Sequence, residues 1–223
     1  MDDDISRIAA LAEPVRRQLY NVVAQARGWL SREQAAAEAG IPLHVAKFHL
    51  DRLVTSGLLD IDYRRLTGRS GPGAGRPSKV YRRADEEILV AVPPRQYDLL
   101  SRILAAAVVE AQRLGRETEE MAMEIARQEG VEHATGAEPS TASATARLCS
   151  RLTDIGFEPD VSETAIDLIN CPFHAVAQRQ TALVCGINLA FVDGLIEALP
   201  CREASARLNP GPERCCVTID LFD

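Results

Sequence analysis

All six cysteines of the 223-residue chain lie in its last third. Cys171 begins the sequence Cys-Pro-Phe-His, and Cys215 is followed directly by Cys216. Thirteen residues separate Cys171 from Cys185, fifteen more precede Cys201, and another thirteen lead to Cys215. Thiolates are soft donors that hold zinc and iron–sulfur clusters. Because so many thiols gather in a short stretch, the sequence predicts metal or redox chemistry there.

The residues alone leave several kinds of thiol site open. His174, three residues after Cys171, could replace a cysteine as a ligand or act as the base of a Cys/His enzyme. Cys171-Pro172 could contact a haem, and thiols without a metal would form an oxidation switch. We assign no catalytic residue, because the chain shows no recognisable Gly-rich phosphate loop or carboxylate pair. Cys149 lies in a helical pattern and is expected to be an ordinary buried residue.

The start of the chain and its hydropathy bear on its location. Met1-Asp2-Asp3-Asp4 is acidic, and no apolar run follows it. A secretory signal would require such a run after a positively charged start. No uninterrupted apolar stretch reaches the eighteen or so residues of a spanning helix. We therefore expect a cytoplasmic protein with no membrane partner, in a reducing compartment where disulfides are rare.

Charge is distributed unevenly along the chain. The net charge is −7, yet residues 44–83 hold nine Lys or Arg against three acids, a local charge of +6. Residues 84–223 carry −12. Such asymmetry is typical of a basic nucleic-acid-binding surface on one domain and an acidic second domain.

The basic stretch lies among short predicted helices and strands. Residues 5–12 have a helical apolar period, and Pro14 suits the first turn of a second helix. Ser31 and Gln34 form a capping box for a third helix, which ends near Gly40. A fourth helix covers residues 42–56. Strands are predicted at residues 58–61 and 80–81, and the Gly- and Pro-rich residues between them, 67–78, are expected to form a mobile hairpin tip.

A helix-turn-helix followed by a β-hairpin is a winged helix-turn-helix. In the fourth helix Val45, Leu50 and Leu53 are predicted to be buried. The residues expected to face the major groove of DNA are His44, Lys47 and His49. Those expected to contact phosphates or the minor groove are Arg52, Arg64, Arg65, Arg69, Arg76, Lys79, Arg82 and Arg83. The alternative interpretation is a solvated basic loop on an ordinary domain.

The rest of the chain completes a predicted α+β protein of three parts. Residues 1–92 form the winged helix-turn-helix domain, and residues 93–130 a long amphipathic helix that links or dimerises it. Residues 131–223 form a small α+β cysteine-rich module. It begins with a linker over residues 130–145 and contains strands at 165–169 and 217–221 and a helix at 183–199. The long helix is expected to pack either against its twin in a homodimer or within its own chain.

Three segments resemble a known family. Leu11-Ala12-Glu13-Pro14-Val15-Arg16-Arg17-Gln18-Leu19 resembles the opening helix of arsenic-repressor-type winged-helix regulators, and Phe48-His49-Leu50-Asp51-Arg52-Leu53 resembles the end of their recognition helix. Gly75-Arg76-Pro77-Ser78-Lys79-Val80-Tyr81 resembles the wing of the Suf-operon repressors, which control iron–sulfur cluster assembly. The resemblance covers residues 5–100, and the cysteine region more loosely.

This resemblance implies a transcriptional regulator, expected to be a repressor, that binds a palindromic double-stranded DNA operator as a homodimer. It also implies an iron–sulfur cluster that sets operator affinity. The implied ligands are Cys171, Cys185, Cys201 and one of Cys215 and Cys216, with His174 as a further alternate. Zinc is the alternative metal, because thiolate tetrahedra are common structural zinc sites. The spacing does not decide between these ligands.

Overall fold

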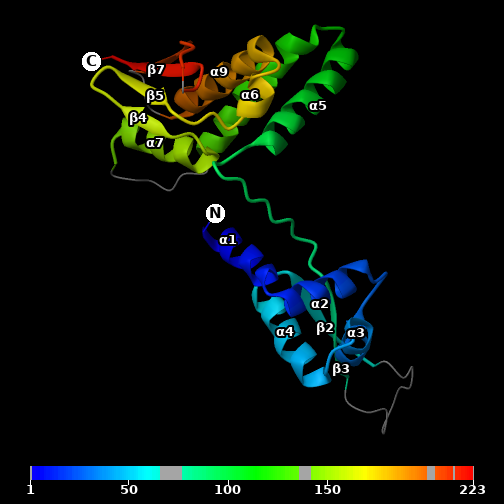
Figure 1. The fold of residues 1–223 in the computed structure, drawn as a ribbon. Helices are drawn as coiled ribbons and strands as arrows, with labels where there is room; N and C mark the ends of the chain where they lie inside the picture. Colours follow the sequence, from blue (N-terminus) through cyan, green and yellow to red (C-terminus); the bar gives the residue numbers. More distant parts are fainter. Residues whose placement is uncertain (1, 66–76, 136–141, 200–203, 213, 223) are drawn as a thin grey trace. The chain divides into compact units, whose positions relative to one another are not determined.

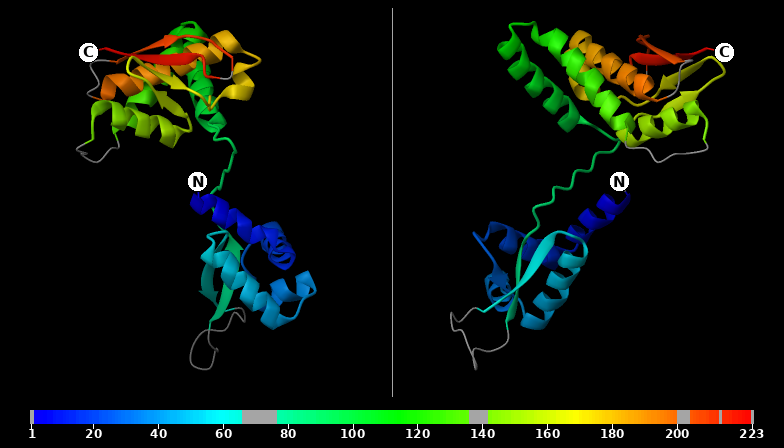
Figure 2. Two further views of the ribbon diagram at one scale, coloured as in Figure 1. Left: turned by 60° about the vertical axis from the view of Figure 1, so that its left-hand side comes forward. Right: turned by 180° about the vertical axis from the view of Figure 1, so that it is seen from behind.

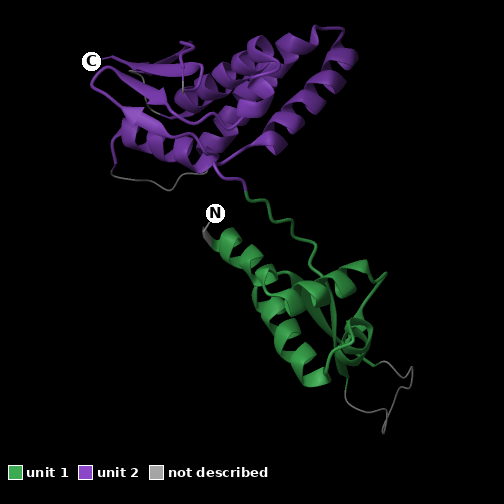
Figure 3. Cartoon of the chain, in the orientation of Figure 1, with its two compact units in different colours: residues 1–90 green, residues 91–223 purple. Residues whose placement is uncertain are grey.

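The computed structural model describes residues 2–65, 77–135, 142–199, 204–212 and 214–222. The protein is α+β, as predicted. It divides into two compact units, residues 1–90 and 91–223 (Figure 3). The predicted boundary after residue 92 lies two residues from the observed one. The segment predicted as a separate linking helix is part of the second unit.

The helices of unit 1 begin and end where local chemistry predicts. α1 (Asp2–Ala9) runs into a 3-10 turn (Ala10–Ala12), and α2 (Pro14–Gln25) is capped by the Glu13 carboxylate, which accepts two backbone N–H groups. Ser31 and Gln34 form the predicted capping box of α3 (Arg32–Ala39), and Gly40 ends this helix in the left-handed conformation with φ 64°. α4 (Leu43–Thr55) follows Pro42.

A three-stranded antiparallel sheet completes unit 1. β1 (Leu30–Ser31) and β2 (Leu59–Arg64) both pair with β3 (Ser78–Arg83), in the order β1-β3-β2. The predicted hairpin strands are confirmed. Of the predicted tip, residues 67–78, the structure describes only Pro77 and Ser78, and Ser78 already belongs to β3; Arg69 and Arg76 lie outside the described residues. The core between helices and sheet contains Leu19, Val23, Leu50, Leu53 and Tyr81.

In unit 2 the prediction of one helix over residues 93–130 is wrong. α5 (Tyr97–Leu114) ends at Gly115, whose φ of 65° turns the chain, and α6 (Thr118–Thr135) packs back against α5. The predicted linker over residues 130–145 is also wrong at both ends, because α6 continues to Thr135 and α7 (Ala144–Ile155) begins at Ala144. Residues 136–141 lie outside the described ranges.

The remaining elements confirm the predicted strands and helix. β4 (Pro159–Val161), β5 (Ala165–Leu168), β6 (Ala204–Leu208) and β7 (Val217–Leu221) form an antiparallel sheet in the order β4-β5-β7-β6. The short α8 (His174–Ala177) precedes α9 (Thr181–Ala198). α9 packs against α6 and also against β6 and β7 (Figures 1 and 2).

The crossing of α6 and α9 depends on two glycines. A Cβ atom on Gly130 would lie 2.1 Å from the carbonyl oxygen of Phe191, and one on Gly194 would lie 2.0 Å from that of Arg127. Only glycine allows backbones this close. Among the described helices, α9 is the one that could span a membrane by length and composition. In this fold its Phe191, Val192 and Leu195 belong to the core of unit 2.

Candidate functional site

The outer face of α4 carries exposed polar, basic and aromatic side chains. Leu50 and Leu53 are buried as predicted, but the third core residue is Ala46, while Val45 is only half-buried. His44 and Lys47 are exposed, and so is Arg52 one turn further on. The face forms a hollow of about 290 Å³ lined by His44, Lys47, Phe48, Asp51, Arg52 and Thr55.

The sequence analysis did not include Phe48 among the expected DNA contacts. Its side chain lies on this outer face and is 63 % exposed. The available signal was its spacing, because His44 and Arg52 stand four residues before and after it and therefore share its helix face. Phe48 therefore lies in the middle of this face, between the exposed His44 and Arg52.

His49 does not lie on the outer face as predicted. Its side chain is only 13 % exposed, and its Nδ1 atom lies 3.3 Å from Oε2 of Glu13, the residue that caps α2. At position 49 the helix has turned toward α2, with which α4 packs. His49 therefore contributes to the packing of the two helices.

Several hairpin cations are held by carboxylates. Lys79 donates to Asp51 across 2.5 Å, Arg82 to Asp60 across 3.0 Å, and Arg64 to Asp62 across 2.7 Å. The guanidinium groups of Arg64 and Arg82 also stack on the Trp29 ring, 4.7 and 4.8 Å from its centre. Of the Lys and Arg side chains predicted to contact DNA, those that make no ion pair with another described residue are Lys47, Arg52, Arg65 and Arg83.

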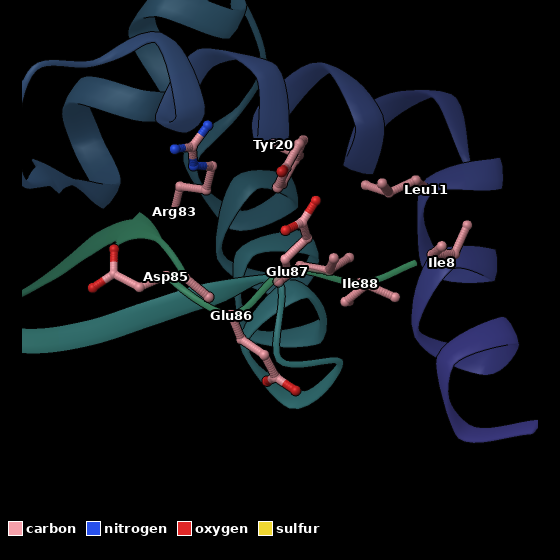
Figure 4. A pocket seen from close by; sticks show the side chains of 10 residues that line it. Ile8, Leu11, Tyr20, Arg83, Asp85, Glu86, Glu87 and Ile88 are labelled. Atoms are coloured by element: carbon pink, nitrogen blue, oxygen red, sulfur yellow. The ribbon is translucent and has the colours of Figure 1, made fainter. Parts of the chain in front are cut away.

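Arg83 lies in a different place from the other cations. It lines a cavity of about 520 Å³ together with Tyr20 and the aliphatic side chains of Ile8, Leu11 and Ile88 (Figure 4). Asp85, Glu86 and Glu87 also border this cavity, and Arg7 donates to Glu86 across 2.7 Å, which lowers the pKa of that carboxyl. The acidic lining is unfavourable for a phosphate, so Arg83 is not part of the basic face.

In unit 2 four of the predicted thiols come together. Cys171 follows β5, Cys185 lies on α9, and Cys215 and Cys216 directly precede β7. Hydrogen bonds join the thiols of Cys171 and Cys215, of Cys215 and Cys216, and of Cys216 and Cys185. Cys171, Cys185 and Cys215 are buried and Cys216 is half-buried. We refer to these four residues as the thiol cluster.

The hydrogen bonds make the four thiols chemically different. The sulfur of Cys215 accepts from Cys171 and Cys216, and the side-chain amide of Asn188 donates to it across 3.0 Å. These bonds lower the pKa of Cys215, because they stabilise its thiolate. The pKa values of Cys171 and Cys216 are raised, because each donates to Cys215 and is also withdrawn from water. Of these three thiols, Cys215 is therefore the one whose thiolate the neighbouring donors stabilise.

The other predicted ligands lie elsewhere. Cys201 falls outside the described residues. His174 is exposed on α8, with its Nε2 atom 3.0 Å from the Gln178 amide, and Cys149 on α7 is half-buried rather than buried. Within the described ranges, no group of three or more His, Cys, Asp or Glu side chains is arranged to hold a metal ion. Hydrogen bonds connect the four thiols in one row, in the order Cys171, Cys215, Cys216, Cys185.

Hydrogen bonds connect the thiol cluster to residues 94–96, near the start of unit 2. The side chain of Asn170, next to Cys171, donates to the carbonyl oxygens of Gly156 and Pro94. Arg95 donates to the Asn170 side chain and to the carbonyl of Cys171, and the Gln96 backbone N–H to the carbonyl of Pro172 across 3.1 Å. A shift of the Cys171 backbone would therefore move residues 94–96 through these hydrogen bonds.

Comparison with known proteins gives no match: no family model, curated protein or solved structure is significantly similar to the chain. The two sites must be interpreted from their own geometry.

Proposed function

We propose that the protein is a DNA-binding transcriptional regulator. In this proposal α2, α3, α4 and the β2–β3 hairpin act as a winged helix-turn-helix, with α4 in the major groove. The observation that carries it is the exposed outer face of α4, where Lys47 and Arg52 have no carboxylate partner among the described residues. An unpaired cation binds a phosphate without first losing an ion pair. Bases are read by side chains on the same face.

The paired cations of the hairpin have a second role in this proposal. Asp51, Asp60 and Asp62 hold Lys79, Arg82 and Arg64 in place, and Trp29 supports two of them. To bind a phosphate, each of these cations must first give up its carboxylate partner, which reduces the net electrostatic gain of the new contact. The paired cations therefore favour phosphates at the right positions over nonspecific contact with DNA. The Coulombic attraction to DNA then depends mainly on Lys47, Arg52 and Arg65, together with Arg69 and Arg76, which lie outside the described residues.

The experiment measures DNA affinity as a function of salt. Each phosphate neutralised by a cation adds about 0.9 to the slope of log affinity against log salt concentration. We expect Lys47→Ala and Arg52→Ala each to reduce the slope by about that amount. Arg83→Ala, which removes the same charge from the cavity lining, is the matched control and should leave the slope unchanged. Equal slopes for all three variants would contradict a major-groove role for α4.

We further propose that the thiol cluster makes DNA binding responsive to a metal or to oxidation. Among the described residues no three side chains are arranged to hold a metal ion as they stand. Thiols are the donors that iron–sulfur clusters and zinc take, so the proposal requires the four cysteines to move together on binding. The group would be held by Cys171, Cys185, Cys215 and Cys216. When bound, it would supply a thiolate-held metal whose occupancy or redox state can change. The residues of this chain do the rest, because Asn170, Arg95 and Gln96 link the backbone at Cys171 to the connection toward unit 1.

The hydrogen-bonded row also favours a second candidate, a metal-free thiol switch. The Cys215 thiolate and the neighbouring Cys171 thiol are in direct contact. Anaerobic purification followed by metal and sulfide analysis separates the two candidates. Bound iron with sulfide, or bound zinc, supports the metal site, whereas a metal-free protein in which Cys171 and Cys215 become linked on mild oxidation supports the switch.

We also propose a homodimer on a palindromic operator, with α5 as the contact. One face of α5 packs on the core through Leu100, Ile103 and Ala107. Outside that face, Tyr97, Val108 and Val109 are exposed at 38, 45 and 62 %, and Val109 is the one that lies opposite the core. A C2 dimer brings such self-complementary patches together and places two α4 helices on successive turns of DNA. Sedimentation of the wild type and of Val109→Glu tests this, since the charge should separate the protomers.

A further inference from the structure

Phe48 differs from every other side chain on the outer face of α4. The neighbouring His44, Lys47, Asp51 and Arg52 can all form hydrogen bonds or ion pairs. The Phe48 ring has only an apolar surface, 63 % of the residue is exposed, and its one ring contact is edge-on to the adjacent His49 at 5.1 Å. The ring is therefore neither part of the unit 1 core nor covered by another described element.

The chemistry of the major groove limits what such a ring can recognise. Base edges there present hydrogen-bond donors and acceptors, to which a phenyl ring offers nothing. The one apolar group on a standard base pair is the C5-methyl group of thymine. Burial of a methyl against an aromatic ring is favourable, whereas the ring against cytosine or a purine edge would desolvate polar atoms without replacing their hydrogen bonds.

We infer that Phe48 determines the sequence preference of the proposed DNA interface by contacting the C5-methyl group of a thymine in the major groove. This inference rests on the proposed DNA-binding function. It goes further, because it assigns base recognition to one side chain and names the base. Lys47 and Arg52, one residue before and four residues after Phe48, then set the position of α4 through phosphates.

The test uses the full chain and a duplex selected by it from a randomised library. Each thymine of that duplex is replaced singly by deoxyuridine, which removes the methyl and keeps every hydrogen-bonding group. For the wild type we expect one replacement in each half-site to weaken binding about fourfold, the effect of one lost apolar methyl contact. Phe48→Ala should bind the thymine and deoxyuridine duplexes equally, and Phe48→Leu should keep part of the difference.

Two further arms separate recognition from general loss of binding. Lys47→Ala is the matched control on the same face, and it should weaken both duplexes alike while keeping the fourfold ratio. A C·G pair at the sensitive position should bind poorly, and 5-methylcytosine there should recover affinity, because its methyl occupies the same place as that of thymine. Since Phe48 is exposed, its variants should melt at the wild-type temperature.

The outcomes distinguish this inference from the function on which it rests. If no duplex is enriched and the wild type does not bind DNA, both the DNA-binding function and the thymine contact are refuted. If the wild type binds a selected duplex but no deoxyuridine replacement weakens it, the thymine contact is refuted while DNA binding stands. If Phe48→Ala retains the fourfold ratio, another side chain reads the methyl and the assignment to Phe48 is overturned.

Discussion

Alanine in place of Gly194 tests how closely α6 and α9 must approach. The new Cβ atom would lie 2.0 Å from the carbonyl oxygen of Arg127. Ordinary contact begins at 3.4 Å, so one helix must move by about 1.4 Å, and the atom in the way is backbone that cannot rotate aside. Overpacking of this kind costs roughly 1 to 3 kcal/mol. Because the obstacle is rigid, we expect a cost in the upper part of that range, which the gain of about 1 kcal/mol from replacing a helical glycine reduces to a net loss of about 2 kcal/mol.

Gly186 on the same helix is the matched control. There a Cβ atom would meet the terminal methyl of Met123 at 2.6 Å, and that methyl lies at the far end of a flexible side chain. Gly186→Ala should therefore be neutral or stabilising, since the helix propensity gain remains.

Calorimetry and urea unfolding of the two variants are the assay. Gly194→Ala should lower the Tm of unit 2 by roughly 5 to 12 °C. Because α9 carries Cys185, this variant should also expose the thiol cluster to alkylation. A Gly194→Ala protein that melts with the wild type, or a Gly186→Ala protein that loses as much, would refute the reasoning.

Three further perturbations give separate predictions. Ser31→Ala removes the side-chain cap of α3 and should lower the free energy of unfolding of unit 1 by about 1 kcal/mol in urea titration; no change would mean that the capping box contributes nothing. Asn188→Leu removes the amide that donates to Cys215, so the pKa of this thiol should rise. Its thiolate absorbance should then appear at higher pH than in the wild type, while an unchanged titration would contradict the role of the amide. Arg95→Ala should leave the reactivity of the thiol cluster intact but weaken the effect of thiol oxidation on DNA affinity, and full retention of that effect would exclude the path through residues 94–96.

Local rules predicted the elements of unit 1 well. The Ser31–Gln34 box, Pro14 and Gly40 each determine a helix end through neighbouring backbone groups, so their effect is visible in a short stretch of sequence. The strands of the hairpin also follow from local pattern and turn residues. The same rules failed in unit 2, where Gly115 ends a helix and Gly130 continues one. Gly115 ends α5 through its own left-handed backbone, with nothing within 4 Å of its Cβ position, whereas Gly130 continues α6 where α9 packs against it. A short stretch of sequence does not tell these two glycines apart.

The candidate sites show the same division. Clustering of four thiols was predicted from their number, but which of them meet depends on how β5, α9 and β7 pack. Pairing of Lys79 with Asp51 joins residues 28 positions apart. The three acids of the basic stretch were visible in the sequence, but which cations they hold was not. His49 was misplaced because one residue on a helix turns the side chain by a large angle, and contact with Glu13 was not visible in the sequence.

The most direct test of the central claim measures DNA affinity in two states of the thiol cluster. Protein purified without oxygen is titrated with its selected duplex, as isolated and again after the thiols have been oxidised or stripped of metal by a chelator. We predict sequence-selective binding in one state and affinity at least about tenfold weaker in the other, a coupling in the usual range for linked sites. Failure to bind duplex DNA in either state would contradict the assignment as a regulator, and equal affinity in both would contradict control by the thiol cluster.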